Sequence, residues 1–335
     1  MAERSSILVI GPRWVGDMVM AQCLFSALRD LHPNAAIDVL APHALARLVL
    51  RMPQISRVID DPLPRGRLAL AGRYAAGRRL RGAYGQAYVM QGNWKSALIP
   101  FFAGLPRRTG YRKEMRYGLL NNMPPLSKAM KRRTAEMFFN MAEGGAFQNP
   151  QLTVDTANQT RLLAENGLRS GGFVALMPGA EFGPAKRWPS DRYAAFAERM
   201  IARGLDVALL GSPKDGAVAA EIAAAAPAVT DLTGKTGLDD AVDILAAARL
   251  AVSNDSGLMH VAAAVGTPVL AIYGSTAPEN TPPLTERRAL IWLGLDCSPC
   301  HSRTCPLQHL DCMNKLDVDR VAEAADRLLE RSPAG

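Results

Sequence analysis

Short apolar runs alternate with longer stretches of helical periodicity along most of this chain, and this alternation restricts the fold more than any other feature. A first series of runs lies in the first half of the chain, at 7–10, 37–40, 57–59 and 87–90. A second series lies in the other half, at 173–177, 206–210, 250–252 and 269–272. Strands that alternate with helices form parallel sheets covered on both faces. The sequence therefore predicts an α/β protein with two doubly wound, Rossmann-like domains.

The chain length of 335 residues also suits two domains. Glycine-containing turns near 165–172 separate the two series, so we predict domains at 1–168 and 169–335. A final helix is expected at about 318–331, and whether it packs back on the first domain is left open. Ligands of open parallel sheets bind beyond the carboxyl ends of the strands. The loops that follow the strands are therefore where a binding site is expected.

The sequence contains no signal for membrane insertion. No apolar run reaches 18 residues, and the first apolar run is too short for the core of a signal peptide. We therefore predict a cytoplasmic protein without a transmembrane helix.

Charge is distributed unevenly between the two halves. Residues 1–165 contain 23 Lys and Arg against 11 Asp and Glu, whereas residues 166–335 contain 16 against 20. The net charges of +12 and −4 add up to +8 for the chain. Such asymmetry favours an anionic partner for the first half, although a role in solubility alone explains it equally well. No nucleic-acid motif accompanies the charge, so a phosphorylated or lipid-linked partner is favoured and nucleic acid is not expected.

The loop 11–17 follows the first predicted strand. Its glycines are spaced as in a phosphate-binding loop, but the Lys-Ser/Thr pair of that motif and the dinucleotide pattern are both missing. Asp17 opens the following helix. Its carboxylate either stabilises the helix start, by capping or through the helix dipole, or accepts a proton from an incoming hydroxyl group.

The loop 178–189 follows the first strand of the second series. The small residues Gly179 and Ala180 allow backbone amides to approach a ligand closely. Lys186 and Arg187 add cationic groups suited to phosphate. The alternative is a surface loop with incidental charge, which its length and position make less attractive.

The loop 253–260 joins a strand to a helix. The backbone amides of Ser256, Gly257 and Leu258 would form an anion site at the helix start. His260 could donate to a phosphate oxygen, or could be a buried imidazole without a ligand. Met259 could pack on a planar base, but a methionine on a helix is more often part of the core.

Two acids near these loops have alternative interpretations. Asp215, in the loop that follows the strand 206–210, could bind ribose hydroxyls or cap the next helix. Asp255 could likewise be a helix cap. The sequence does not separate these possibilities.

Four of the five cysteines cluster near the end of the chain, at Cys297, Cys300, Cys305 and Cys312. This density allows a structural Zn²⁺ site, although the spacing is not that of a standard zinc ribbon. A cytoplasmic location argues against stable disulfide bonds. The fifth cysteine, Cys23, is expected to be an ordinary buried residue on a helix.

Four segments also resemble a known family. They read ILVIGPRWVGDMVM, FFAGLPRRTGYRKEMRYGLL, PGAEFGPAKRWP and SNDSGLMHVAAAVGTPVLAIYG. In this order they are similar to segments of the ADP-heptose:lipopolysaccharide heptosyltransferases, over about residues 7–284. The second and third segments resemble the branch of the family that adds the second heptose. The resemblance implies a GT-B architecture, in which two Rossmann-like domains face a central cleft with the acceptor on the first domain and the nucleotide sugar on the second.

The resemblance also implies roles for individual residues. Asp17 matches the proposed general base of the family, and Lys186 matches the lysine that meets the donor phosphates. The similar segments and the loops that follow the strands then predict a set of donor-binding residues, namely Gly179, Ala180, Glu181, Ser212, Asp215, Asp255, Ser256, Gly257, Met259 and His260. The predicted acceptor-binding residues are Arg13, Trp14, Arg112, Lys113 and Arg116.

The implied reaction is an inverting transfer of L-glycero-D-manno-heptose from ADP-heptose to the first heptose of the lipopolysaccharide inner core. No Asp-x-Asp pair stands at a strand end, so no metal cofactor is expected. The acceptor, heptosyl-Kdo-lipid A, would be met by a monomeric enzyme at the cytoplasmic face of the inner membrane. The alternatives are the branch that adds the first heptose, another nucleotide-sugar transferase or epimerase of the same fold, and, more distantly, a basic nucleic-acid-binding protein.

Overall fold

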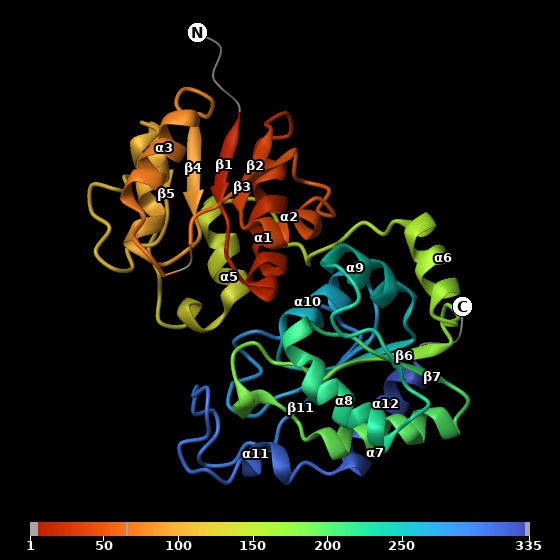
Figure 1. Cartoon of the computed structure of the whole chain (residues 1–335). Coiled ribbons are helices and arrows are strands. Elements are labelled where there is room, and N and C mark those ends of the chain that lie inside the picture. The colour runs from red at the N-terminus through yellow and green to blue at the C-terminus, as the bar shows by residue number, and fades with distance from the viewer. Residues whose placement is uncertain (1–5, 65, 332–335) are drawn as a thin grey trace. The chain divides into compact units, whose positions relative to one another are not determined.

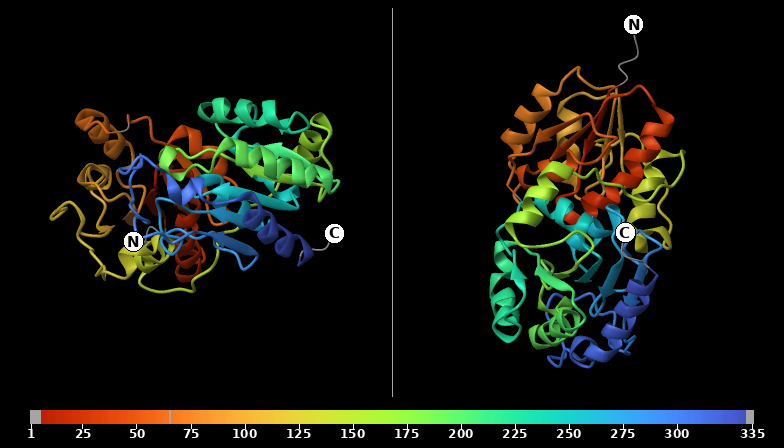
Figure 2. Two further views of the ribbon diagram at one scale, coloured as in Figure 1. Left: turned by 90° about the horizontal axis from the view of Figure 1, so that it is seen from below. Right: turned by 90° about the vertical axis from the view of Figure 1, so that its right-hand side faces the viewer.

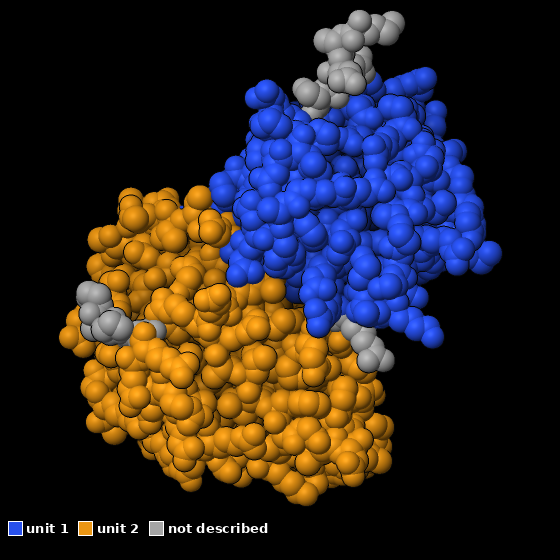
Figure 3. Space-filling view, turned by 180° about the vertical axis from the view of Figure 1, so that it is seen from behind, with its two compact units in different colours: residues 1–150 blue, residues 151–335 orange. Residues whose placement is uncertain are grey.

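The computed structural model describes residues 6–64 and 66–331, which form two compact units, Met1–Pro150 and Gln151–Gly335. Each unit contains its own parallel β-sheet, as the ribbon in Figure 1 shows. Figure 3 colours the two units separately. The predicted α/β class with two doubly wound sheets is confirmed.

The boundary between the units lies before the predicted one at 168/169. Helix α6 (Thr156–Glu165) packs on helix α9 (Leu238–Ala247) and therefore belongs to the second unit. Asn158 of α6 donates to the Asp243 carboxylate of α9 at 2.8 Å. The glycine pair at 171–172 forms a turn ahead of the first strand of unit 2, with Gly171 at φ +69°. The glycines near 170 thus mark a turn inside the second unit.

Unit 1 contains a five-stranded sheet in the order β3-β2-β1-β4-β5. In chain order the strands are β1 (Ile7–Ile10), β2 (Ile37–Ala41), β3 (Arg57–Asp60), β4 (Gln86–Val89) and β5 (Arg107–Thr109). The helices are α1 (Val15–Leu31), α2 (His43–Val49), α3 (Leu70–Arg79), α4 (Leu98–Phe102) and α5 (Thr134–Phe139). Every residue of the central strand β1 is buried, as expected for a parallel sheet with helices on both faces.

Unit 2 contains a six-stranded sheet in the order β11-β10-β9-β6-β7-β8. Its strands are β6 (Phe173–Met177), β7 (Asp206–Leu209), β8 (Thr230–Asp231), β9 (Leu250–Asn254), β10 (Val269–Ile272) and β11 (Arg288–Ile291). The remaining helices are α7 (Ser190–Ala202), α8 (Gly216–Ala225), α10 (Gly257–Ala264), α11 (Asp311–Asn314) and α12 (Val318–Glu330). Figure 2 shows helices on both sides of this sheet.

The final helix, α12, packs on α7 and β11 inside unit 2. Val321, Ala325 and Leu328 of α12 join the buried cluster that also holds Phe196 of α7. The apolar face of this helix is therefore covered within unit 2, so its burial requires no contact with the first domain.

The strand order creates one switch point in each sheet. In unit 2, β6 and β9 are neighbours, but the chain leaves β6 through α7 and leaves β9 through α10. Helices α7 and α8 pack together, as do α9 and α10, so the two pairs cover opposite faces. The carboxyl edge between two such strands is the usual ligand site of sheets of this kind. Unit 1 has the same relation between β1 and β4.

No helix in the part of the chain that the structure describes is long and apolar enough to cross a membrane.

Candidate functional site

The loops after β6 and β9 meet through an ion pair between Lys186 and Asp255. Lys186 Nζ lies 2.5 Å from Asp255 Oδ2, and the two side chains are only 12% and 6% exposed. The residues are 69 positions apart, and each follows one of the two strands at the switch point. A desolvated ammonium group therefore stands where the fold class binds its ligands.

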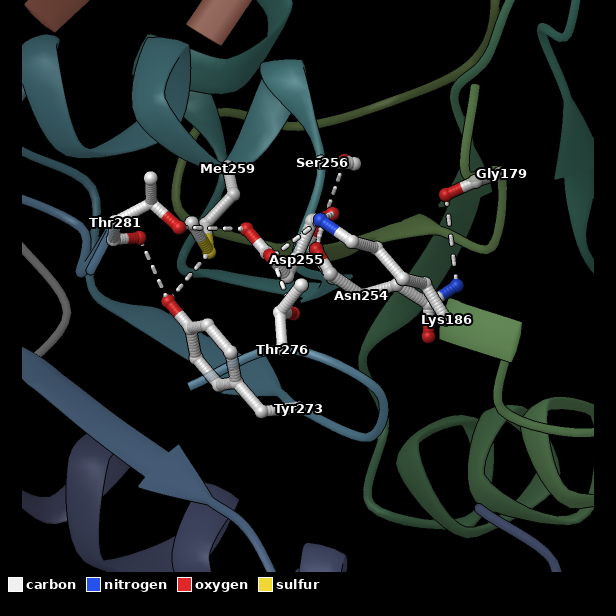
Figure 4. Close-up of polar contacts among 10 residues, drawn as sticks. Gly179, Lys186, Asn254, Asp255, Ser256, Met259, Tyr273, Thr276 and Thr281 are labelled. Carbon is white, nitrogen blue, oxygen red and sulfur yellow. Dashed lines mark hydrogen bonds and ion pairs between the residues drawn. The ribbon is translucent and has the colours of Figure 1, made fainter. Parts of the chain in front are cut away.

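Two threonine hydroxyls complete the surroundings of the Asp255 carboxylate, as Figure 4 shows. Thr276 donates to Oδ2 at 2.6 Å and Thr281 donates to Oδ1 at 3.3 Å. Both threonines lie in the loop after β10, which sequence reasoning did not identify as part of the site. Its polar sequence directly after a buried strand was the signal that could have indicated it.

Asn254 ties the end of β9 to the loop after β6. Its side-chain amide donates to the Pro178 carbonyl at 2.7 Å, and its Oδ1 accepts from the Trp188 amide at 3.1 Å. The same oxygen accepts from the Tyr193 hydroxyl group at 3.1 Å. This asparagine, which sequence reasoning also missed, holds both ends of the segment that carries Lys186.

Asp215 packs directly against Gly179. A Cβ atom at Gly179 would lie 2.4 Å from Asp215 Oδ1, so this position requires glycine while Asp215 keeps its place. The other oxygen, Oδ2, accepts from the Ser212 amide at 2.9 Å and from the Ser212 hydroxyl at 2.8 Å. The Asp215 carboxylate therefore caps the short 3-10 turn Pro213–Asp215, and it makes no side-chain capping bond to α8, the next helix. Its interpretation as a ribose ligand stays a prediction. Arg187 NH2 lies 4.0 Å from Oδ1.

The neighbouring predicted donor residues differ in exposure. Ala180 is 2% exposed, whereas Glu181 is exposed and forms a surface ion pair with Lys214 at 2.6 Å. Phe182 lies between two cations, with Lys186 Nζ 4.9 Å and the Arg303 guanidinium 5.4 Å from its ring centre.

Helix α10 begins at Gly257, directly after Asp255 and Ser256. Ser256, rather than Asp255, occupies the capping position, so Asp255 serves as the partner of Lys186 and not as a helix cap. His260, one turn into the helix, is 4% exposed, and burial lowers its pKa to about 4. The imidazole is therefore neutral near pH 7 and can offer one N–H group without a charge.

The structure corrects the prediction that Met259 packs on a base. Its side chain is fully buried, and its sulfur lies 3.6 Å from the Tyr273 hydroxyl oxygen. The same hydroxyl donates to the Thr281 carbonyl at 2.9 Å. Met259 thus belongs to the core beneath the site, the alternative that its position on a helix had left open.

The cysteine-containing segment packs on the loop that carries Lys186. The Ala185 amide donates to the Arg303 carbonyl at 3.1 Å, and the His301 amide donates to the Ser275 carbonyl at 2.7 Å. A Cβ atom at Gly183 would lie 2.5 Å from the Arg303 carbonyl oxygen. The segment therefore supports the loop after β6 from one side.

The predicted zinc site is not assembled. Among residues 6–64 and 66–331, no three His, Cys, Asp or Glu side chains are placed to hold a metal ion. Cys312 belongs to the apolar core of unit 2, and burial raises the pKa of its thiol to about 11. The other members of the cluster are half-buried free thiols, namely Cys297, Cys300 and Cys305.

In unit 1, Asp17 lies in the first turn of α1, at the carboxyl edge of β1. Its side chain is half-buried, and Trp14, rather than Asp17, occupies the capping position. Desolvation and the nearby Arg116 lower the pKa of Lys113, and the Asp17 carboxylate opposes this effect. A carboxylate and a cation from two separate predicted motifs are thus brought together at the switch point of this unit.

Two other predicted acceptor residues have defined surroundings. Arg13 donates to Asp61 Oδ2 at 2.7 Å and to the Leu63 carbonyl at 2.8 Å, which ties the loop after β1 to the loop after β3. Arg112 is exposed, and its guanidinium group lies 5.7 Å from the centre of the Tyr117 ring. Arg112 is therefore available to a ligand, whereas Arg13 is already ion-paired.

The structure corrects the prediction for Arg116. This residue is 1% exposed, and its guanidinium group donates to the carbonyl groups of Gln91 and Tyr111. Desolvation lowers its pKa to about 10. An arginine enclosed in this way orders the loop after β5 and is not placed to contact a bulky acceptor. Its neighbours Arg112 and Lys113 are exposed.

These features define a class of protein. Two doubly wound sheets with a cationic, phosphate-compatible group at one switch point and a half-buried carboxylate at the other are the parts of a nucleotide-sugar glycosyltransferase of the GT-B type.

Comparison with known proteins identifies the family. Residues 73–311 match the family model described as glycosyltransferase family 9 (heptosyltransferase). The chain is 43% identical over 310 residues to lipopolysaccharide heptosyltransferase 2 of Escherichia coli, covering 86% of this chain and 88% of that protein. It is 42% identical over 311 residues to lipooligosaccharide heptosyltransferase 2 of Haemophilus influenzae, with the same coverage. The chain therefore belongs to glycosyltransferase family 9 and is a glycosyltransferase.

A solved structure gives the same result. The structure of E. coli ADP-heptose lipopolysaccharide heptosyltransferase II superposes with a TM-score of 0.87 at 38% sequence identity, covering 97% of this chain and 99% of that chain. The predicted resemblance to the heptosyltransferases, and to the branch that adds the second heptose, is confirmed.

Proposed function

We propose that this chain transfers L-glycero-D-manno-heptose from ADP-heptose to the first heptose of the lipopolysaccharide inner core, with inversion at the anomeric carbon. The observation that carries the proposal is the ion-paired Lys186 at the switch point of unit 2, whose side chain is 12% exposed, in a chain 43% identical to a lipopolysaccharide heptosyltransferase 2. The relatives are named as heptosyltransferases of lipopolysaccharide or lipooligosaccharide, and the solved structure is named for ADP-heptose as well.

In this proposal Lys186 stabilises the departing diphosphate. Its ammonium group is paired with Asp255 in the absence of donor, and a phosphate oxygen would share or replace that contact. The amides at the start of α10 add partial positive charge without a mobile ion. Charge that develops on the leaving group would thus be met by groups already in place, which is the effective form of electrostatic catalysis.

The proposed general base is Asp17, in unit 1. Inversion requires one in-line displacement, in which the base removes the proton of the attacking hydroxyl as the bond to the heptose forms. The carboxylate is half-buried, so a hydroxyl group can reach it, and the first turn of a helix favours a negative charge. The nearby Lys113 adds a cation that can hold an anionic acceptor group.

The two units would divide the work, with the acceptor on unit 1 and the donor on unit 2. The exposed Arg112 and Lys113 are the proposed acceptor contacts, together with Trp14. We further propose that the enzyme acts as a monomer at the cytoplasmic face of the inner membrane, where the lipid-anchored acceptor lies. No metal cofactor is part of the proposal.

Product analysis tests the proposal. The purified chain is incubated with ADP-heptose and either Kdo-lipid A or its mono-heptosylated form, and the products are resolved by mass spectrometry and linkage analysis. We expect one heptose to be added to the mono-heptosylated acceptor alone. Addition to the acceptor that lacks heptose would instead identify the branch that adds the first heptose.

A thermal unfolding assay separates the remaining alternatives. ADP-heptose at about 100 times its dissociation constant should stabilise the fold by about 2.7 kcal/mol. Stabilisation by a different nucleotide sugar, with none from ADP-heptose, would contradict the donor. Filter binding to RNA and DNA at physiological salt tests the distant nucleic-acid alternative, and we expect no retention above that of a neutral control protein.

A further inference from the structure

Helix α3 exposes two large apolar side chains and buries one of its arginines. Its solvent face carries Leu70 and Tyr74, each 51% exposed, whereas its buried face carries Arg73, which is 8% exposed. The guanidinium group of Arg73 donates to the Leu68 carbonyl at 2.7 Å and to the Lys95 carbonyl at 3.0 Å. A surface helix ordinarily turns its apolar stripe inward. This helix therefore leaves two large apolar side chains half exposed to solvent.

The neighbouring helix α4 continues this surface. Phe101 is 42% exposed, and its ring contacts Phe102, which in turn contacts Tyr74 with ring centres 5.3 Å apart. The two helices approach closely because Gly77 faces α4, where an added Cβ would lie 2.7 Å from the Phe102 Cβ. Leu68, at 39% exposure, extends the surface at the start of α3. We call the exposed side chains of Leu68, Leu70, Tyr74 and Phe101 the apolar face.

The charge around the apolar face has one sign. Residues 62–113 contain eleven Lys and Arg and no Asp or Glu. The exposed cations nearest to the apolar face in sequence are Arg67, Arg78, Arg79 and Arg81. A surface that serves only solubility normally mixes both signs. Complete exclusion of acids beside exposed aromatic and aliphatic side chains indicates a partner that is apolar and anionic together.

We propose that the apolar face and its arginines dock unit 1 on a bilayer rich in anionic lipids. Apolar and aromatic side chains of a short helix can enter the boundary between headgroups and acyl chains, while arginines bind lipid phosphates. This surface lies on α3 and α4, whereas Asp17 belongs to α1 and Arg112 to the loop after β5. The inference deepens the proposed location at a membrane face and rests on that part of the proposed function.

Vesicle flotation of the full chain, without donor or acceptor, tests the docking surface. The wild type should float with vesicles of phosphatidylethanolamine and phosphatidylglycerol, and not with phosphatidylcholine alone. The triple variant Leu70→Ser, Tyr74→Ser, Phe101→Ser should bind the anionic vesicles at least tenfold more weakly. The double variant Arg78→Glu, Arg79→Glu should lose at least tenfold and should also lose the preference for anionic lipid.

Matched controls carry the same substitutions elsewhere. Leu50, Leu290 and Leu307 are also exposed apolar residues, so their combined change to serine should leave vesicle binding within twofold of the wild type. Reversal of Arg320 and Arg327, exposed on α12, to glutamate should do the same. Circular dichroism and thermal unfolding of all variants verify the fold.

Two results would overturn the proposal. The first is vesicle binding by the triple-serine variant equal to that of the wild type. The second is a wild-type dimer in analytical ultracentrifugation that the triple-serine variant converts to a monomer, with no vesicle binding by either protein. That outcome would assign the apolar face to a second copy of the chain. Heptose transfer to a detergent-dispersed acceptor should be unchanged in the triple-serine variant, so failure of docking and failure of the transferase reaction are distinguished.

Discussion

At the scale of single residues, two ion pairs of the loop after β6 show how burial decides how much an ion pair contributes to stability. Lys186–Asp255 and Lys214–Glu181 have nearly equal distances, 2.5 and 2.6 Å, but the first pair is almost enclosed and the second is open to solvent. Exposed pairs typically contribute 0–1 kcal/mol, whereas removing one partner of a buried pair leaves an uncompensated charge. Only the first pair can therefore link stability to donor binding.

Replacing Lys186 with alanine should have two effects. The donor KM should rise and turnover should fall, because the diphosphate loses its cation. The fold should also lose about 3 kcal/mol, because the Asp255 carboxylate is left buried without its partner. Steady-state kinetics and denaturant unfolding measure the two effects. Lys214→Ala is the matched control and should change neither; a Lys186→Ala enzyme with unchanged donor kinetics would remove Lys186 from the site.

Asp17→Asn keeps the shape of the side chain and removes its basicity. Turnover should fall by about two to four orders of magnitude, the usual contribution of a general base, while ADP-heptose binding should be nearly unchanged. Single-turnover kinetics and calorimetric donor titration provide the two measurements. Asp319→Asn, which alters a first-turn carboxylate of α12, controls for the helix-dipole effect. Wild-type turnover in Asp17→Asn would exclude this carboxylate as the base.

His260 should make the fold sensitive to mild acid. Burial lowers its pKa to about 4, below the ordinary value of about 6.5 that it regains on unfolding. Between these values the unfolded chain binds a proton that the folded chain refuses, so stability is complete above about pH 6.5 and is lost as the pH falls toward 4. The loss should be on the order of 3 kcal/mol. The difference between the unfolding free energies of wild type and His260→Gln at several pH values isolates it.

An equal slope in wild type and His260→Gln between pH 4 and 6.5 would contradict the assignment of His260 as a buried neutral imidazole.

At the scale of elements, the loop 178–189 after β6 is held by close contacts with other loops and with β9. Gly179 meets the Asp215 carboxylate, Gly183 meets the Arg303 carbonyl, and Asn254 bonds to the Pro178 carbonyl. The loop after β6 is thus fixed by the loop after β7, by β9 and by the cysteine-containing segment. Such support from several directions gives Lys186 a defined position before the donor arrives.

Gly179→Ala tests this packing. The added Cβ would lie 2.4 Å from Asp215 Oδ1, so the loop or the carboxylate must move, at a cost of about 1–3 kcal/mol in stability. Donor affinity should fall with it, because Lys186 follows in the same loop. Gly216→Ala is the matched control, since its added Cβ meets no atom within 4 Å, and it should be neutral or slightly stabilising. Equal donor affinity in both variants would contradict the packing argument.

At the scale of the whole molecule, the charge asymmetry agrees with the proposal that unit 1 binds the acceptor and unit 2 binds the donor. The first half has a net charge of +12, and the second has −4 although it carries the proposed site for a diphosphate. A single desolvated lysine and helix-start amides act over short distances and need no bulk positive charge. An extended acidic headgroup, by contrast, is attracted by many screened surface cations.

Salt should therefore affect the two substrates differently. Raising the ionic strength from about 0.05 to about 0.5 M shortens the Debye length roughly threefold. This change should raise the acceptor KM several-fold and change the donor KM much less. Initial rates on a detergent-dispersed acceptor, with each substrate varied in turn, measure both. Parallel increases in the two constants would argue against local recognition of the donor by Lys186.

Much of the architecture could be predicted from local sequence. The buried strands β1, β2, β6, β7, β9 and β10 were predicted from their apolar runs. Strands β5 and β11 were missed because they are edge strands that each begin with arginine. The domain boundary was placed too late because the glycines near 170 form a turn and not a linker, and α6 joins unit 2 through its packing on α9.

Only part of the candidate site could be predicted from local sequence. The residue types of Lys186 and Asp255 were predicted for their loops, but their direct pairing was not, since it joins positions 69 residues apart. Arg116 and Met259 were assigned to ligands because their residue types suit ligands, whereas both are buried. For Thr276 and Thr281 the only sequence signal was the polar loop after β10, and Asn254 carries no signature of its own.

The sequence by itself thus determined the two α/β units, the segregation of charge and the family, because each depends on local periodicity, composition or motif order. The tertiary structure decided which cations are enclosed and which are exposed, which acid pairs with Lys186, and that Leu70 and Tyr74 of α3 are exposed while Arg73 is buried. The physical reason is that burial and long-range pairing depend on strand order and on how helices pack on the sheets. Neither property can be obtained from neighbours along the chain.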